Sequence, residues 1–222
     1  AISNYGMNDE QIMDEHASRE KSKTHLKIGI LNRMESSGRS ILNAKDLVQS
    51  IESEIAKARN KANHTNHSRL LLPPFAQVSS TVALEYFEGK NSLREQIQFF
   101  HSIDILVSPH GAQLTGLPFM ANKKCTQLIE FFPDRYFMPD FYGSLAIDSG
   151  IGYSHVYFSP ETVVAQSRKY STAVFQRIVA RPIPLRTKHR AQNLCVDTNL
   201  VIDAIQKAIQ DWGKCQQQEQ ER

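Results

Sequence analysis

Several features that would place this 222-residue chain in a familiar class are missing from its sequence. There is no run of about 18 apolar residues, so no segment is expected to span a membrane, and no signal peptide is visible. We therefore expect membrane association only through a segment outside this chain. The net charge of +3 is too small to indicate nucleic-acid binding, although a mildly basic surface suits an anionic ligand.

The sequence also lacks the short motifs of common cofactor and metal sites. It has no glycine-rich dinucleotide fingerprint, no phosphate loop ending in Gly-Lys-Ser/Thr and no helix with paired histidines. The three cysteines, Cys125, Cys195 and Cys215, do not have metal-ligand spacing, and their odd number leaves at least one thiol unpaired within the chain. Cys125 opens an apolar segment, where we expect plain packing. No metal site or tightly bound cofactor is predicted, and metal dependence is left open.

What the sequence does contain is an alternation of strand-like and helix-like segments. Strands are predicted at residues 25–33, 78–87, 103–107, 125–133 and 154–159, and helices at 41–58, from the capping box Ser92–Glu95, after His110 and from Asp197. This alternation implies a mostly parallel sheet with helices on both faces. We therefore predict an α/β, Rossmann-like domain at 24–215, after a polar linker or N-terminal extension at 1–23 and before a disordered tail at 216–222.

The most informative stretch runs from Ile103 to Pro133. An apolar run without alternation, which is typical of a strand buried on both faces, stops at Ser-Pro-His-Gly-Ala (108–112). The glycine lets the backbone approach a ligand closely. A helix is predicted to begin there, and a second apolar strand follows. Because ligands of open parallel sheets bind at the carboxyl ends of strands, against helix N-termini, this stretch predicts a site for an anion, such as a nucleotide diphosphate.

Two loops are predicted to leave the same edge of this sheet, since parallel strands share one direction. The first carries Arg33 and Arg39, with Asn43 one turn into the next helix, and the second carries His110 at a helix start. Guanidinium groups offer forked donors to phosphate oxygens, and the N–H groups of a helix start favour an anion. Taken singly, the arginines could be ordinary surface charges and the His-Gly-Ala segment a structural turn. Their convergence favours a diphosphate clamp.

Glu130 lies within the apolar strand Leu-Ile-Glu-Phe-Phe. A carboxylate there is unfavourable unless it lies at the strand end or is paired. At the carboxyl end it could accept hydrogen bonds from ribose hydroxyls, as acidic residues do in nucleotide-binding folds. The alternative is an edge position with the carboxylate in water.

The segment from Pro160 to Val196 is strongly basic, with Glu161 as its single acidic residue. Such a run most often forms a solvated, partly irregular face. We favour that interpretation over a second binding patch.

Taken in order, these segments resemble glycosyltransferase family 61. The similarity is carried by Arg33-x5-Arg39-Ser-Ile-Leu-Asn43, by Asp104-Ile-Leu-Val-x-x-His110-Gly-Ala-x-Leu-Thr115 and by Leu-Ile-Glu130-Phe-Phe-Pro133. The family includes plant xylan-decorating transferases and animal protein O-linked N-acetylglucosaminyltransferases, among them the EGF-domain-specific enzyme. The resemblance implies the C-terminal, donor-binding domain of an inverting enzyme with two Rossmann domains, the GT-B type.

The resemblance further implies transfer of a sugar from a UDP-sugar to a hydroxyl group of a glycan or protein. The donor-binding residues that it implies are Arg33, Arg39, Asn43, Ser108, His110, Gly111, Ala112, Thr115 and Glu130. Arg39 and His110 are the expected catalytic residues. Inversion needs a base on the acceptor hydroxyl and stabilisation of the leaving diphosphate, and only the second task is assigned to this chain.

Two other classes of function stay open on the residues alone. One is a non-catalytic domain that binds a nucleotide-sugar or a glycan. The other is an unrelated Rossmann-like enzyme that acts on a phosphorylated metabolite.

Two N-glycosylation sequons, Asn63-His-Thr65 and Asn66-His-Ser68, follow one another in a polar loop. We expect glycans at Asn63, Asn66 or both. With the luminal setting of the resembling family, the sequons imply the secretory-pathway lumen, in the Golgi or the endoplasmic reticulum.

Overall fold

The computed structural model describes residues 26–63, 74–78, 82–87, 89, 91–120, 124–134, 136–158 and 189–222. The predicted linker at 1–23 and most of the basic segment at 160–196 lie outside the described residues. None of the helices in the described part of the chain combines the length and the apolar character needed to cross a membrane.

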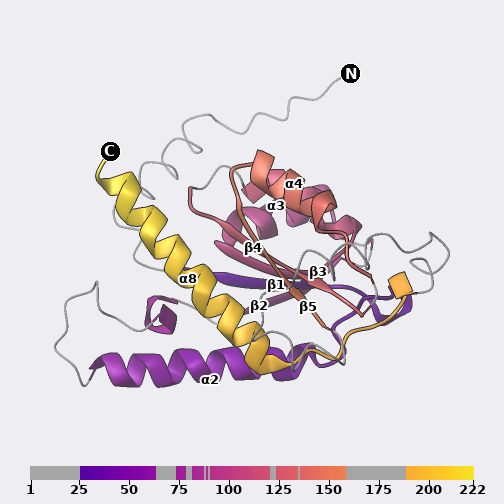
Figure 1. Ribbon diagram of the computed structural model, residues 1–222, viewed down its shortest axis with the longest axis horizontal. Helices are drawn as coiled ribbons and strands as arrows, with labels where there is room; N and C mark the ends of the chain where they lie inside the picture. Colours follow the sequence, from indigo (N-terminus) through magenta and orange to yellow (C-terminus); the bar gives the residue numbers. More distant parts are fainter. Residues whose placement is uncertain are drawn as a thin grey trace, which may run out of the picture.

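A five-stranded, wholly parallel sheet with flanking helices forms the domain (Figure 1). The elements in chain order are β1 (Ile28–Asn32), η1 (Glu35–Ser37), α2 (Ala44–Asn63), η3 (Pro74–Gln77), β2 (Ala83–Tyr86), α3 (Leu93–Ser102), β3 (Ile105–Pro109), η4 (Ala112–Met120), β4 (Gln127–Phe132), α4 (Pro139–Asp148), β5 (Gly152–Tyr157) and α8 (Thr198–Gln220), where η marks a 3₁₀ helix. The strand order is β2-β1-β3-β4-β5, with every pairing parallel. The predicted α/β, Rossmann-like architecture is confirmed.

Helices cover both faces of this sheet and give it two hydrophobic clusters. In Figure 1, α3 and α4 lie above the sheet, α2 lies below it and α8 crosses in front. The cluster under α2 and α8 contains Ile30, Val107 and Ile129, whereas the cluster under α3 and α4 contains Leu31 and Leu106. Because side chains alternate along a strand, neighbouring residues are buried in opposite clusters, which explains the continuous apolar runs of the central strands.

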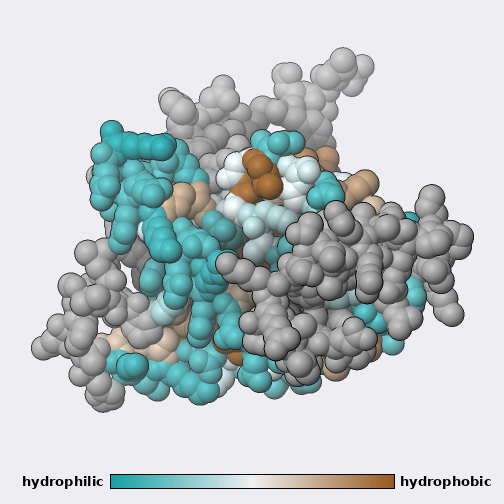
Figure 2. Space-filling view, in the orientation of Figure 1, coloured by the Kyte–Doolittle hydropathy of each residue, from teal (hydrophilic) through white to brown (hydrophobic). Residues whose placement is uncertain are grey.

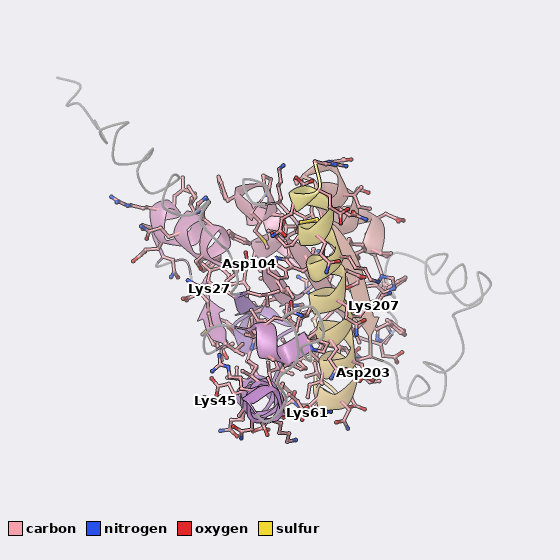
Figure 3. The ribbon with its side chains drawn as sticks, turned by 90° about the vertical axis from the view of Figure 1, so that its left-hand side faces the viewer. Lys27, Lys45, Lys61, Asp104, Asp203 and Lys207 are labelled. Carbon is pink, nitrogen blue, oxygen red and sulfur yellow. A yellow bond between two sulfur atoms is a disulfide. The ribbon has the colours of Figure 1, made fainter. Side chains whose placement is uncertain are left out.

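The amino ends of β1 and β3 are joined by a short set of hydrogen bonds between Lys27 and Asp104. The Lys27 N–H donates to the Asp104 carboxylate (2.9 Å), and the Asp104 N–H donates back to the Lys27 carbonyl (2.9 Å); both residues are labelled in Figure 3. This fixes the register in which Ile28 lies beside Ile105. The carboxyl ends of the two strands are therefore level.

Local sequence signals set several helix ends. The capping box predicted at Ser92 and Glu95 is present at the start of α3. Asp197 caps α8, where its carboxylate accepts from the N–H groups of the first turn. The α2 helix starts at Ala44, later than predicted, because Ile41 instead pairs with Leu194 in a parallel bridge.

The helix predicted after His110 is a 3₁₀ helix, η4, rather than an α-helix. Pro118 lies inside it and has no N–H to donate to an α-helical ladder. Gly116 lies against the Phe100 ring, so closely that an added Cβ would be 2.0 Å from a ring carbon. The tight winding thus follows from the proline and from packing on α3.

The α8 helix presents a hydrophilic outer surface (Figure 2), and its residues Asp203 and Lys207 are exposed (Figure 3). Its buried side, which includes Val201, Ile205 and Trp212, packs in the cluster that α8 shares with α2.

Two corrections concern the carboxyl end of the chain. The segment from Gln216, predicted to be disordered, is helical as far as Gln220, and Glu219 within it forms ion pairs with Lys124 and with Arg222. Cys125, predicted simply to pack, forms a disulfide with Cys215. The third cysteine, Cys195, is free and exposed.

The disulfide should contribute substantially to stability, since it joins cysteines 90 residues apart in sequence. The substitution Cys215→Ser, which removes the disulfide, is expected to lower the free energy of unfolding by about 2–4 kcal/mol in urea denaturation. The matched control, Cys195→Ser, should change it by less than about 0.5 kcal/mol. Equal stabilities for the two variants would contradict a structural role for the bond.

Candidate functional site

The candidate site lies at the carboxyl ends of β1 and β3, where two loops meet. Arg33 follows β1 directly, and its guanidinium lies over Gly111, which follows β3. Nη1 of Arg33 donates a hydrogen bond to Oε1 of Gln113 (2.7 Å). An added Cβ at Gly111 would lie 2.0 Å from the same Nη1, so the absence of a side chain makes room for the guanidinium. The pairing of β1 with β3 thus brings the arginine loop and the His-Gly-Ala loop together.

Asn32, the last residue of β1, closes the loop that carries the arginines. Its Oδ1 accepts hydrogen bonds from the N–H groups of Arg33 and Ile41 (both 2.8 Å), and its Nδ2 donates to the Ile41 carbonyl (3.0 Å). Nε of Arg33 donates to the Gly38 carbonyl (2.9 Å). The loop therefore holds the Arg33 side chain in one direction. Neither Asn32 nor Gln113 is among the residues predicted from the sequence.

Arg39 is the second arginine of this loop and is 4% exposed, with a left-handed φ of 61°. Its guanidinium carbon lies 5.7 Å from the centre of the Tyr136 ring. Within the described residues, its Nε has no hydrogen-bond partner and no ion pair involves Arg33 or Arg39. Burial lowers the pKa of Arg39, and the nearby Arg33 charge lowers it further. A buried guanidinium with an unsatisfied N–H group is unfavourable, which indicates a place for an anion.

A third arginine, Arg190, reaches the same region from the C-terminal part of the chain. The segment containing it lies along the arginine loop, where the Arg39 N–H donates to the Gln192 carbonyl (3.0 Å). Burial lowers the pKa of Arg33, and the Arg190 charge lowers it further. Arg190 is exposed, as expected for a solvated face, yet it adds positive charge to the site.

Glu130 is completely buried in β4, and both of its carboxylate oxygens have partners. Oε1 lies 2.6 Å from Nδ1 of His110, and Oε2 accepts a hydrogen bond from the Tyr153 hydroxyl (2.8 Å). Burial raises the pKa of Glu130, and the hydrogen bonds from His110 and Tyr153 oppose that rise. The alternative of an edge carboxylate in water is wrong, because β4 lies between β3 and β5. The geometry favours a role in holding His110 over direct contact with ribose.

Four aromatic rings surround the His110 ring. The centroids of Phe132, Tyr136 and Tyr142 lie 5.2–5.3 Å from it, and that of Phe141 lies at 6.3 Å. Three of these rings come from the aromatic segment after β4, which gave no clear secondary structure from sequence. Its density of aromatic residues beside a candidate strand end was the signal that could have found them. Phe141 is 62% exposed and lies at the edge of the site.

Other residues assigned to the donor by resemblance are engaged within the fold. Asn43 exchanges two hydrogen bonds with the backbone of Val196 (both 2.9 Å). The Ser108 hydroxyl donates to the Leu31 carbonyl (2.9 Å) and is buried. These two side chains hold the loops in place. Ala112 and Thr115 are exposed on η4, where the Thr115 hydroxyl donates to the Ala112 carbonyl (2.8 Å).

The remaining site predictions concern glycans and metals. Asn63 is the last residue of α2, but its side chain and the whole of Asn66 lie outside the described residues. In the described ranges, no group of three or more His, Cys, Asp or Glu residues is arranged to hold a metal ion.

Gly111 offers a direct test of the site geometry. In Gly111→Ala, the methyl group would displace the ends of the Arg33 and Gln113 side chains, which are flexible, so the fold should survive. We expect affinity for inorganic pyrophosphate to fall at least about tenfold by calorimetry, as when one charged hydrogen bond is lost. The control Gly213→Ala lies in α8, where Gln77 is 3.7 Å away, and should leave that affinity unchanged. A Gly111→Ala protein with unaltered pyrophosphate affinity would rule out this site for anions.

Comparison with known proteins places this geometry in a family. The model of the glycosyltransferase 61 family matches residues 6–129, which is more than half of the chain. The match includes both loops of the site, with Arg33, Arg39 and His110, and ends within β4. No curated protein matches the chain. On the strength of the family match, the chain belongs to the glycosyltransferase 61 family.

Proposed function

We propose that this chain is the donor-binding half of an inverting, GT-B type glycosyltransferase, which transfers a sugar from a UDP-sugar to a hydroxyl group of a glycan or protein. The observation that carries the proposal is a pair of arginines in the loop after β1. Arg33 lies over Gly111, Arg39 is buried, and neither forms an ion pair with a described residue. Membership of the glycosyltransferase 61 family supports the reaction class.

The chemistry of the site suits a diphosphate. Two guanidinium groups present several N–H donors to phosphate oxygens, and Nε of the buried Arg39 lacks a partner within the described part of the chain. In sugar transfer, negative charge grows on the departing diphosphate as its bond to the sugar breaks. Fixed positive groups in a partly dry site stabilise that charge without rearrangement. In this proposal, Arg39 and His110 contact the phosphate that is bonded to the sugar, and Arg33 with Gly111 and Ala112 binds the other phosphate of the departing diphosphate.

The position of the site in the sheet supports a nucleotide rather than a small anion. β1 and β3 are adjacent central strands, and the loops that follow them leave the sheet at one edge. Ligands of doubly wound folds lie outside the carboxyl ends of such strands. The exposed Phe141, whose ring centroid lies 6.3 Å from that of His110, offers a flat apolar surface, which suits a sugar or a nucleobase.

We further propose that the protein works in the lumen of the Golgi or endoplasmic reticulum. The Cys125–Cys215 disulfide supports an oxidising compartment, because such bonds are rare in reducing ones. The sequons at Asn63 and Asn66 support the same setting.

The arginine clamp can be tested by comparing UDP with uridine in calorimetry. Arg33→Ala or Arg39→Ala should weaken UDP binding by about 1.5–3 kcal/mol, the value of a hydrogen bond to a charged group. Uridine affinity should change by less than twofold, on the order of 0.4 kcal/mol, since uridine lacks the paired charge. Arg39→Lys should restore UDP affinity only in part, because an ammonium cannot bind two oxygens as a fork.

The control for this comparison is Arg59→Ala on α2, where the guanidinium donates to the Val78 carbonyl and is remote from the clamp in sequence. This substitution should leave the affinities for UDP and for uridine unchanged. UDP binding should also weaken as salt concentration rises. If an arginine variant loses UDP and uridine affinity equally, that arginine maintains the fold and the clamp is refuted.

A further inference from the structure

In the buried pair of His110 and Glu130, one imidazole nitrogen, Nε2 of His110, is not engaged by the pair. Nδ1 is engaged by Oε1 of Glu130 at 2.6 Å, so the ring orientation is fixed. Nε2 is at the other side of the ring, away from Glu130, and makes no hydrogen bond with any described residue. His110 also precedes Gly111, over which the Arg33 guanidinium lies. Nε2 is therefore the ring nitrogen that no described residue engages.

The number of protons on this pair decides what Nε2 can do. When the pair shares one proton between Oε1 and Nδ1, it is neutral overall and Nε2 carries a hydrogen, so Nε2 is a donor. This holds whether the shared proton sits on the carboxyl or on the ring. When the pair loses one proton, the hydrogen that remains is on Nδ1 and donates to the carboxylate, so Nε2 has a lone pair and the pair carries one negative charge. The charge of the pair and the hydrogen-bonding sense of Nε2 change together.

The groups around the pair determine which form is stable. The charged and titratable groups around it are Tyr136 after β4, Asp140 and Tyr142 from α4, Tyr153 and His155 from β5, and Arg39 beside Tyr136. With an empty clamp, the arginine charges favour the negative pair. A bound diphosphate neutralises those charges and brings negative oxygens close, which favours the neutral pair.

The surroundings of Glu130 influence the protonation of the His110–Glu130 pair in two opposing ways. Burial raises the pKa of the Glu130 carboxyl, which helps the pair to keep its proton. Burial and the nearby carboxylate also raise the pKa of Tyr153, so its hydroxyl stays protonated and continues to donate to Oε2. The hydrogen bond from Tyr153 stabilises the carboxylate and so limits the rise in the pKa of Glu130.

We propose that His110, Glu130 and Tyr153 link donor binding to the uptake of one proton, which makes Nε2 of His110 a hydrogen-bond donor to the diphosphate. This inference rests on the proposed function and adds to it a dependence of donor affinity on pH. Glu130 and Tyr153 are positioning residues, since they act on the ligand only through His110.

Calorimetry with UDP-glucose measures this uptake directly. Titrations at one pH in two buffers of different ionisation enthalpy give the number of protons taken up on binding. UDP-glucose is the better probe because its diphosphate carries a sugar, whereas the terminal phosphate of UDP itself titrates near pH 6. We expect uptake of up to one proton, and an affinity that falls by up to about tenfold per pH unit at pH values where the pair is deprotonated in the free protein.

Two variants should move this pH profile in opposite directions. Glu130→Gln removes the negative partner of the imidazolium, so the profile should shift to lower pH by at least about one unit. Tyr153→Phe removes a hydrogen bond to the carboxylate, so the pair should hold its proton more tightly and the profile should shift to higher pH. The matched control is Tyr157→Phe on the same strand, where the hydroxyl contacts Asp134, and it should leave the profile unchanged.

The outcomes separate this inference from the function on which it rests. Arg33→Ala should weaken UDP-glucose binding and reduce the proton uptake without abolishing it, because Arg39 and the diphosphate still act on the pair. Binding of UDP-glucose without uptake, or with the same pH profile in the Tyr153 and Tyr157 variants, overturns the proton link and leaves donor binding intact. If UDP-glucose does not bind to the unmodified protein, the proposed function fails and the proton link fails with it. Opposite shifts in the two variants cannot come from a general loosening of the fold.

Discussion

The parallel pairing of β1 with β3 is the constraint on which the site depends. The Lys27–Asp104 hydrogen bonds join the two strands at their amino ends and set the register, so the carboxyl ends come out level. The loops that follow must then leave side by side, and this brings the Arg33 guanidinium over Gly111. In another strand order the same arginines would be ordinary surface charges. The positive charge of the site thus depends first on the pairing of β1 with β3, which brings the two loops together.

Two charged groups are buried at this edge, and the fold treats them differently. Glu130 has both oxygens satisfied, by His110 and Tyr153, so its burial is compensated within the chain. Arg39 is nearly as buried, yet its Nε has no partner among the described residues. Buried polar groups without a hydrogen-bond partner tend to occur at functional sites, where the ligand supplies the missing partner. The contrast makes Arg39 the better marker of the binding site and Glu130 a support for its neighbour.

The sequence predicts the local features of this protein well, because periodicity and capping are local. The parallel sheet, the Ser92–Glu95 capping box and the shared edge of the two loops all follow from short stretches. Long-range pairings do not. Tyr153 reaches Glu130 only because β5 pairs with β4, and Asn43 bonds Val196 across most of the chain. With three cysteines, spacing alone leaves the pairing of Cys125 open, and nothing local indicates that Gly116 packs on Phe100.

A crystal structure of the protein with UDP would test the central claim most directly, namely that the edge formed by β1 and β3 binds the diphosphate of the donor. The account predicts diphosphate oxygens within hydrogen-bonding distance, about 2.7–3.2 Å, of the Arg33 and Arg39 guanidinium groups and of the Gly111 backbone. It also predicts Nε2 of His110 facing the same oxygens. A nucleotide bound at another edge of the sheet, or a diphosphate turned to solvent with Arg39 still unpaired, would contradict it.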